Sequence, residues 1–311
     1  MKKILRSTFG RLFNKNWMMA AILTVSGASV FTACTSYVDN PIPPKGIAID
    51  ETNFPDENFR AFLLDKDYGK DGILTDEEIS RITYLYPVFE GITSMKGVEF
   101  FTELEDLDCY GNYLKELDMS RNTKLTYLDC SDCKITKLNI ANNVLLNTLY
   151  CEYNELTELD ISNNTELVYL DCFDNKLTQL DVSKNLALYQ LDFEDNKLTS
   201  IDLRQNAELK ELYCSGNEFT SIDLSNNPKL TLLHFYDNKI SGQEMDNIIN
   251  CLPQNTSGKE YEFAVYSING EREDKNVCTK SQVEAVKAKG WTPLYFDFDE
   301  YDFINYEGSD E

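Results

Sequence analysis

The stretch LVYLDCFDNKLTQLDVSKNLA, residues 167–187, decides the fold, because the segments before and after it repeat its pattern. Leucine returns at a constant interval without insertion or deletion, and the shared pattern is L-x-x-L-x-C-x-x-N-x-L-x-x-L-D-x-S-x-N. Seven such units follow one another, beginning at Leu104, Leu125, Leu146, Leu167, Leu188, Leu209 and Leu230. Self-similarity at a fixed period of this length predicts a solenoid, in which neighbouring units stack and bury one continuous core.

Each unit contains one motif twice, because L-x-x-L-x-(apolar)-x-x-N recurs within the same unit. In the quoted unit the first half spans residues 167–175 and the second half spans residues 177–185. Apolar residues at alternate positions predict a short strand with its leucines turned inward, and asparagine is typical of the turn that ends it. We therefore expect two short strands per unit and two columns of asparagine along the stack.

These in-phase copies resemble bacterial leucine-rich repeats, in the short form whose 21-residue repeat has two nested halves. The resemblance covers residues 104–240 and implies an α/β-type solenoid dominated by short parallel strands. Departures are few: Cys133 stands in place of a first-half asparagine, and Phe193 and Phe235 stand in place of cysteine. Because an uncapped stack exposes leucine, residues 46–103 are expected to form a helical N-terminal cap and residues 241–311 an α+β C-terminal cap.

The repeated cysteine occupies an inward position that phenylalanine fills in two of the seven units. A position that accepts either side chain needs apolar volume, and a free cysteine packs as a small hydrophobic residue. A straight row of thiols in an apolar core does not supply metal ligands that converge from several directions. We therefore interpret the row as core packing with unreactive thiols. Its members are Cys109, Cys130, Cys151, Cys172 and Cys214.

Residues 1–33 differ from the rest, since they contain five Lys or Arg side chains, no acid and an apolar run from Trp17 to Phe31. This pattern predicts a secretory signal peptide. The sequence Phe-Thr-Ala-Cys that ends at Cys34 resembles a bacterial lipoprotein box, which implies that Cys34 is acylated. The alternative is an ordinary cleaved signal followed by an incidental cysteine. The proline-rich residues 34–45 are expected to form a stiff tether.

The chain has a formal net charge of −24, which removal of the basic leader would make more negative. Such a chain repels phosphate backbones and anionic lipid surfaces, so the charge argues against nucleic-acid binding. Lipid on Cys34 is then the one expected membrane contact. The expected location is the outer membrane, on its cell-surface or its periplasmic side.

Residues 65–78, DKDYGKDGILTDEE, resemble a calcium-binding EF-hand loop, in which oxygen ligands alternate around a glycine and end at a glutamate. If Gly72 is placed at the sixth position of the calcium loop, the third position falls on Gly69, which has no side-chain ligand. If the loop is counted from Asp65 instead, it becomes too long. The alternative is a helix-turn-helix cap without an ion. The ligands that the resemblance implies are Asp65, Asp67, Asp71 and Glu78.

Two further cysteines, Cys251 and Cys278, lie in the C-terminal cap outside the repeated row. In a secreted protein they could form a disulfide, but the sequence does not place their Cα atoms within bridging distance. Both the paired and the free state therefore remain open.

With leucine and cysteine assigned to the core, the outward positions of the first-half strands are left to carry a function. These positions are rich in tyrosine and aspartate. Partners dock on the extended faces of solenoids, and tyrosine offers a large contact area with few rotatable bonds. The expected partner-binding residues are Tyr110, Tyr127, Asp129, Tyr150, Tyr169, Asp171, Phe173, Asp192, Tyr213, His234 and Tyr236.

Three functions remain compatible with this face. It could bind a protein partner, which we expect, or a carbohydrate that stacks on the same aromatic rings, or it could belong to a scaffold without a ligand. An enzyme is not expected, because the chain has one histidine, His234, and no nucleophile elbow, glycine-rich phosphate loop or paired-histidine metal motif. His234 is expected to be a surface side chain, and no cofactor is expected apart from calcium in the N-terminal cap.

Overall fold

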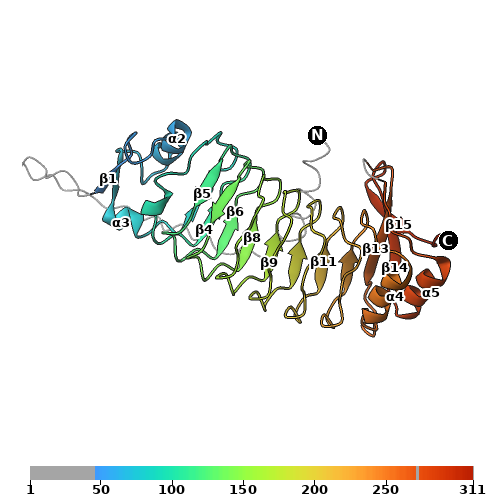
Figure 1. The fold of residues 1–311 in the computed structure, drawn as a ribbon. Coiled ribbons are helices and arrows are strands. Elements are labelled where there is room, and N and C mark those ends of the chain that lie inside the picture. The colour runs from blue at the N-terminus through green and yellow to red at the C-terminus, as the bar shows by residue number, and fades with distance from the viewer. Residues whose placement is uncertain (1–45, 271–272, 311) are drawn as a thin grey trace, which may run out of the picture. The chain divides into compact units, whose positions relative to one another are not determined.

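The computed structural model describes residues 46–270 and 273–310, and this part of the chain contains one sheet of eleven strands (Figure 1). Strands of the repeats pair in parallel with the equivalent strand of the next unit, as in Tyr169 opposite Gln190. The predicted parallel solenoid is therefore confirmed. The repeats contribute β4 (Asp106–Asp108), β6 (Tyr127–Asp129), β8 (Thr148–Tyr150), β9 (Tyr169–Asp171), β10 (Gln190–Asp192), β11 (Glu211–Tyr213) and β12 (Leu232–His234).

The core runs along the inside of the stack, as the leucine spacing predicts. In each repeat strand the central leucine is buried. The five cysteines of the row are at most 1% exposed, as are Phe193 and Phe235, which replace cysteine in two units. Cys172 Sγ also donates to the carbonyl oxygen of Asp192 at 3.3 Å. The thiols thus fill apolar volume between neighbouring rungs.

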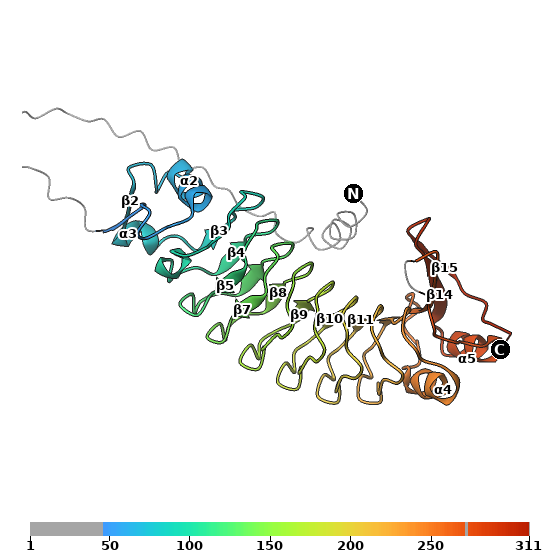
Figure 2. The same cartoon turned by 45° about the horizontal axis from the view of Figure 1, so that its top comes forward.

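The expected second-half strand forms in the first two units but not in the later ones. Among the described residues, only β5 (Glu116–Asp118) and β7 (Lys137–Asn139) form a second-half sheet, which is parallel and two-stranded. In later units the second-half backbones are joined through asparagine side chains, as when Asn185 Nδ2 donates to the carbonyl oxygen of Asn164 at 2.8 Å. The stack of repeats is curved (Figure 2), and a curved stack cannot keep the same rung spacing on its two sides. On the second-half side, asparagine amides and single backbone bonds, such as Lys176 N–H to the carbonyl oxygen of Leu156 at 2.8 Å, therefore link the later units.

The first-half asparagines form a hydrogen-bonded ladder in the core. Asn175 Nδ2 donates to the carbonyl oxygens of Cys151 at 3.0 Å and Cys172 at 3.1 Å, and Asn175 Oδ1 accepts from the backbone N–H of Leu156 at 3.0 Å. The same offsets recur at Asn154, Asn196, Asn217 and Asn238. Each amide therefore joins its own turn to the preceding rung and satisfies backbone groups that are buried from water.

Cys133 interrupts this ladder. Its thiol donates to the carbonyl oxygen of Cys109 at 3.1 Å, where an asparagine amide would donate. In the ordinary unit, the asparagine oxygen accepts from a backbone N–H of the preceding unit, as Asn175 does from Leu156. The equivalent N–H near Cys133 is that of Leu114. Because the thiol provides no such oxygen, this N–H has no acceptor among the described residues. Cys133 is therefore a weaker rung in the first-half ladder.

The residue before each first-half asparagine adopts the left-handed backbone conformation, with φ between 47° and 72°. Glycine enters this region without cost, and aspartate enters it more readily than most residues. Tyr153 is the bulky exception, and its ring packs edge-on against Phe173 with centroids 4.9 Å apart. In most units the sequence signals this conformation by an Asp-Asn or Gly-Asn pair. The residues with this conformation are Gly111, Asp132, Tyr153, Asp174, Asp195, Gly216 and Asp237.

The N-terminal cap contains two helices and a small antiparallel sheet. Helix α2 (Glu57–Asp65) is capped by Asp56, and that carboxylate also accepts from the backbone N–H and the hydroxyl of Thr93, which ties the helix to the next coil. Helix α3 (Asp76–Ile79) begins with a capping box formed by Thr75 and Glu78. The other elements are β1 (Gly46–Ala48), β2 (Ile73–Thr75), β3 (Tyr84–Leu85) and the 3-10 turn η2 (Val98–Phe100).

The C-terminal cap extends both the sheet and the asparagine ladder. Strands β13 (Glu262–Ile268) and β14 (Thr292–Asp297) continue the parallel sheet, and β15 (Asp302–Asn305) closes it in an antiparallel hairpin. Asn276 donates to the carbonyl oxygens of Phe235 and Val265 and accepts from the N–H of Ile240 at 2.8 Å, as a repeat asparagine would. The helices α4 (Gly242–Cys251) and α5 (Lys280–Ala288) form the helical part of this cap.

Cys251 and Cys278 are both free thiols in the structure, so the disulfide that the sequence left open does not form there. Cys251 ends helix α4, whereas Cys278 is buried just before helix α5. Burial raises the pKa of Cys278 to about 12, which keeps it protonated at neutral pH. Cys278 therefore packs as a core residue of the cap.

Candidate functional site

We use the term sheet face for the side chains at the two outward positions of each repeat strand and at the position two residues beyond its end. Alternation along each strand places these side chains on the side opposite to the buried leucine. Because the units are in phase, equivalent residues form three columns across the sheet. The columns run from Asp106 to Leu232, from Asp108 to His234, and from Tyr110 to Tyr236, in steps of one repeat unit.

The aspartates of the sheet face have a local structural role. Asp171 Oδ1 accepts from the backbone N–H of Phe173 at 3.1 Å, and Asp192 Oδ1 accepts from that of Glu194 at 3.0 Å. The second-half aspartates accept in the same way from the backbone N–H two residues later in the chain, as Asp181 Oδ1 does from Ser183 at 2.9 Å. This turn bond explains why aspartate recurs in both halves, and it also relieves the repulsion along the second-half column.

The two kinds of aspartate differ in their surroundings. The backbone N–H of Ser183 lowers the pKa of Asp181, which lies exposed on the second half. By contrast, burial raises the pKa of Asp171 well above its ordinary value, and the carboxylates of Glu152, Glu194 and Asp129 raise it further. The local hydrogen bond is the same, so the raised pKa of Asp171 reflects first its burial and then the acids that gather on the sheet face.

Aromatic rings lie beside these acids. Tyr127 and Tyr150 pack edge to face with centroids 5.8 Å apart, and Tyr169 lies 5.8 Å from Tyr189. Tyr189 was not among the predicted residues, because it precedes β10 rather than lying on an outward position of the strand. Lys210 lies over its ring at 4.7 Å. The rings thus support one another across neighbouring units, as cross-strand pairs do in sheets.

The structure corrects part of the predicted site, because five of its residues are buried. Tyr110 is covered by Phe89, with ring centroids 4.9 Å apart, and Asp129 and Phe173 are also buried. His234 and Tyr236 lie beneath the C-terminal cap, where Phe303 reaches both rings. The sequence missed this because β13 to β15 continue the sheet beyond the seventh unit. The six residues that keep partial exposure are Tyr127, Tyr150, Tyr169, Asp171, Asp192 and Tyr213.

His234 is a buried residue rather than the expected surface side chain. Its Nε2 lies 3.1 Å from Glu262 Oε2, and its ring centroid lies 5.0 Å from Tyr213 and 4.5 Å from Phe303. The hydrogen bond from His234 lowers the pKa of Glu262. These contacts join the last repeat to the cap, which gives the single histidine a structural role.

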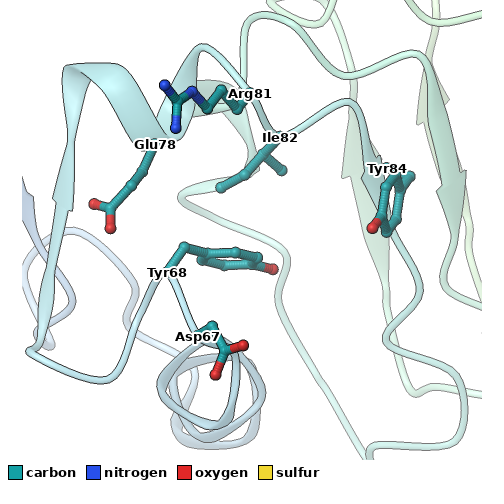
Figure 3. A pocket seen from close by; sticks show the side chains of 6 residues that line it. All are labelled: Asp67, Tyr68, Glu78, Arg81, Ile82 and Tyr84. Atoms are coloured by element: carbon teal, nitrogen blue, oxygen red, sulfur yellow. The ribbon is translucent and has the colours of Figure 1, made fainter. Parts of the chain in front are cut away.

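The carboxylates of the EF-hand-like loop are engaged in local contacts. Asp67 pairs with Lys70 at 2.5 Å, Asp71 accepts from the N–H of Ile73 at 3.0 Å, and Glu78 accepts from the N–H of Thr75 at 2.9 Å. Figure 3 shows Asp67 and Glu78 pointing in different directions from either side of Tyr68. Within residues 46–270 and 273–310 no cluster of three or more His, Cys, Asp or Glu could hold a metal ion. Asp65, Asp67, Asp71 and Glu78 are therefore not assembled as a calcium site here.

Comparison with solved structures supports the fold. The functional domain of InlJ from Listeria monocytogenes, which includes a cysteine ladder, is 30% identical with a TM-score of 0.63, over 78% of this chain and 55% of that one. The present chain thus spans about half of the InlJ structure. The chain therefore has a leucine-rich repeat solenoid fold. Internalin C2 from the same organism is 20% identical with a TM-score of 0.55, over 63% of this chain and 90% of that one, and shares the fold.

Other comparisons add no family beyond this fold. No protein-family model and no curated protein matches the leucine-rich repeat chain. Within the described residues, no helix is both long and apolar enough to span a bilayer. The signal peptide, the tether and Cys34 lie outside the described residues, so the expectation of a lipid anchor stays a prediction.

Proposed function

We propose that this leucine-rich repeat protein is a non-enzymatic, lipid-anchored protein of the outer membrane that binds a protein partner through its sheet face. The carbohydrate-binding and scaffold functions that the sequence leaves open remain as alternatives for that face. The single observation that carries the proposal is the gathering of acids and partly exposed tyrosines from neighbouring units on this face, where the pKa of Asp171 is raised.

This observation favours a partner with basic side chains at the contact. Burial and like charges disfavour the ionised form of Asp171, and Asp106 and Glu211 on the same face also have pKa values raised chiefly by burial. A lysine or arginine brought against these carboxylates relieves the repulsion, so binding and ionisation support each other. Partly exposed tyrosines beside the acids supply the contact area that hot spots of interfaces use.

The sheet face is tested by removing charge without removing the turn bonds. We expect Asp171→Asn with Asp192→Asn to weaken binding of the partner at least about tenfold at low salt and to flatten its salt dependence. Asparagine keeps the oxygen that accepts the backbone N–H. The partner is first captured from extracellular extract by the parent protein, identified by mass spectrometry, and then measured as a purified protein by calorimetry.

A matched control exists on the other side of the solenoid. Asp160→Asn with Asp181→Asn removes the same charge at the same spacing of one repeat, and both aspartates make the same bond to the N–H two residues on. This control should bind like the parent. Equal weakening in both double variants would argue against the sheet face, and a parent that captures no protein would favour the scaffold.

The same contact predicts a dependence on pH. Ionised Asp171 should bind the basic partner, so affinity should fall as pH is lowered through its raised pKa, above the range near 3.9 where an ordinary aspartate titrates. In the Asp171→Asn variant this part of the pH dependence should be missing. Calorimetry across a pH series, with the second-half double variant as reference, measures both effects.

The anchor has its own test. We expect Cys34→Ser to release the protein from the membrane fraction, because serine cannot carry the thioether-linked lipid and the chain is too acidic to adhere by charge. Cell fractionation followed by immunoblotting measures the distribution, with Cys251→Ser as a control that should stay in the membrane fraction. If the Cys34 variant is retained as well as the parent, the chain is not lipidated there.

A further inference from the structure

A pair of exposed tyrosines lies at the first strand of the sheet, outside the seven repeats. Tyr84 is 62% exposed and Tyr86 is 48% exposed, whereas Leu85 between them is buried. Their rings stack with centroids 5.4 Å apart and an interplanar angle of 24°. The Tyr86 hydroxyl donates to Asp106 Oδ2 at 2.9 Å, which fixes the stack on the edge of the sheet. An ordered aromatic surface of this kind is pre-organised for a flat ligand.

An open cavity of about 380 Å³ is lined by Tyr84, one member of this pair (Figure 3). Tyr84 forms one side of the cavity, and Tyr68 lies across from it on the loop between α2 and β2. Burial, together with the neighbouring Tyr84, raises the pKa of Tyr68 to about 12, so this phenol stays a neutral donor and acceptor. The remaining lining residues are Asp67, Glu78, Arg81 and Ile82.

The charged residues around the cavity already have partners. Asp67 pairs with Lys70, and Arg81 pairs with Glu77 at 2.5 Å. Glu78 Oε2 accepts from the backbone N–H and the hydroxyl of Thr75 in the capping box. The hydrogen bonds to Glu78 come from uncharged donors, so this carboxylate keeps its negative charge. The cavity therefore offers aromatic faces and two phenol hydroxyls beside a slightly negative lining.

We propose that the Tyr84–Tyr86 stack and the cavity beside Tyr68 bind a neutral carbohydrate. A pyranose ring has an apolar C–H face that packs on an aromatic ring and a rim of hydroxyls that exchange hydrogen bonds with phenols and paired ions. The cavity volume lies at the small end of the range for ligand pockets, so it admits one or two sugar rings. Asp106, which accepts from Tyr86, lies at the end of the sheet face, but the other residues of this site lie outside that face, and the site does not depend on the function proposed for it.

Two other ligand classes fit the residues less well. An anionic ligand would meet Asp67, Glu78 and Asp106 in a chain of net charge −24. An anchoring side chain of a protein partner usually fills a desolvated pocket, whereas Tyr84 remains mostly exposed beside an open cavity. A neutral ligand with one apolar face and many hydroxyls matches the surface that is present.

The test is binding of defined trisaccharides to the purified full-length protein. We expect saturation-transfer NMR and calorimetry to detect at least one of cellotriose, maltotriose and mannotriose below about 10 mM, the affinity range of open, shallow sites. The anionic sugar 3′-sialyllactose should bind at least several-fold more weakly. Tyr84→Ala should weaken trisaccharide binding about tenfold or more, and Tyr68→Phe, which removes one hydroxyl but keeps the ring, several-fold.

Tyr113→Ala is the matched control, since Tyr113 is also mostly exposed but packs on Lys134 outside the cavity. It should bind the trisaccharide like the parent. Circular dichroism on every variant confirms that the solenoid is folded. The proposal is overturned if the folded parent binds none of the three neutral sugars, if Tyr84→Ala binds as tightly as the parent, or if 3′-sialyllactose binds as well as they do.

Discussion

Replacing Asn175 by alanine is expected to lower the free energy of unfolding by about 3–5 kcal/mol. The substitution removes three amide donations, to the carbonyl oxygens of Cys151, Cys172 and Phe173, and the oxygen that accepts from the N–H of Leu156. Because these backbone groups lie in the buried ladder, water does not replace the lost partners at low cost. Urea unfolding followed by circular dichroism measures the change.

Two controls separate the ladder from a general effect of losing asparagine. Asn185 on the second half donates to the carbonyl oxygens of Ile161 and Asn164, and its Oδ1 has no partner among the described residues, so Asn185→Ala should cost less. Asn163 makes one exposed bond, to the carbonyl oxygen of Ala141, and its loss should cost less than about 1 kcal/mol. Equal losses at all three positions would contradict the ladder.

The reverse substitution, from cysteine to asparagine, is suggested by Cys133, the weaker rung of the first-half ladder. Cys133→Asn should raise the free energy of unfolding by about 1 kcal/mol, because the amide would give the N–H of Leu114 its missing acceptor and restore the full donor set. The same urea unfolding experiment measures it. A destabilised Cys133→Asn variant would mean that this turn no longer accommodates the amide.

The second large expected effect concerns the thiols. Iodoacetamide should modify the core cysteines at least about 1,000-fold more slowly in the folded protein than in urea, because access requires opening of the core against several kcal/mol. Burial also raises the pKa of Cys130, Cys151, Cys172 and Cys214, which removes the reactive thiolate. Mass spectrometry of a time course measures each peptide separately.

Cys251 provides the internal reference, since it is partly exposed and no long-range opening is needed to reach it. It should be alkylated first. If the cysteines of the repeats are modified as fast as Cys251 in the native protein, the side chains assigned to the core do not point inward, and the sheet face would lose its basis.

The repeat made most of the solenoid predictable. Its constant period fixes which leucines share a face. At the position of Cys172 another unit has Phe193, and this exchange already indicates in the sequence that the position lies in an apolar core. The capping boxes at Thr75 and Thr279 are equally local, because each depends on two side chains within one helical turn. The leucine faces and the helix caps can therefore be predicted from the spacing of residues that are close in the sequence.

The remaining features depend on contacts between distant segments. Nothing in the spacing of the seventh unit shows that Phe303 covers His234 and Tyr236, since the covering strand comes much later in the chain. The exposed pair Tyr84 and Tyr86 lies outside the repeats, and its signal was only the alternation around a buried Leu85. The carboxylates near Asp67 match a calcium loop in sequence, but local ion pairs and helix capping engage them.

The in-phase ladders have a consequence for how such molecules change length. Each second-half asparagine bonds backward by the same offsets, so one more copy of the unit would meet the same donors and acceptors on both sides. A tandem duplication of the encoding DNA could therefore enlarge the outer surface by one strip while both ends stay as they are. Lineages could adjust reach and footprint in whole steps, without redesigning the interior.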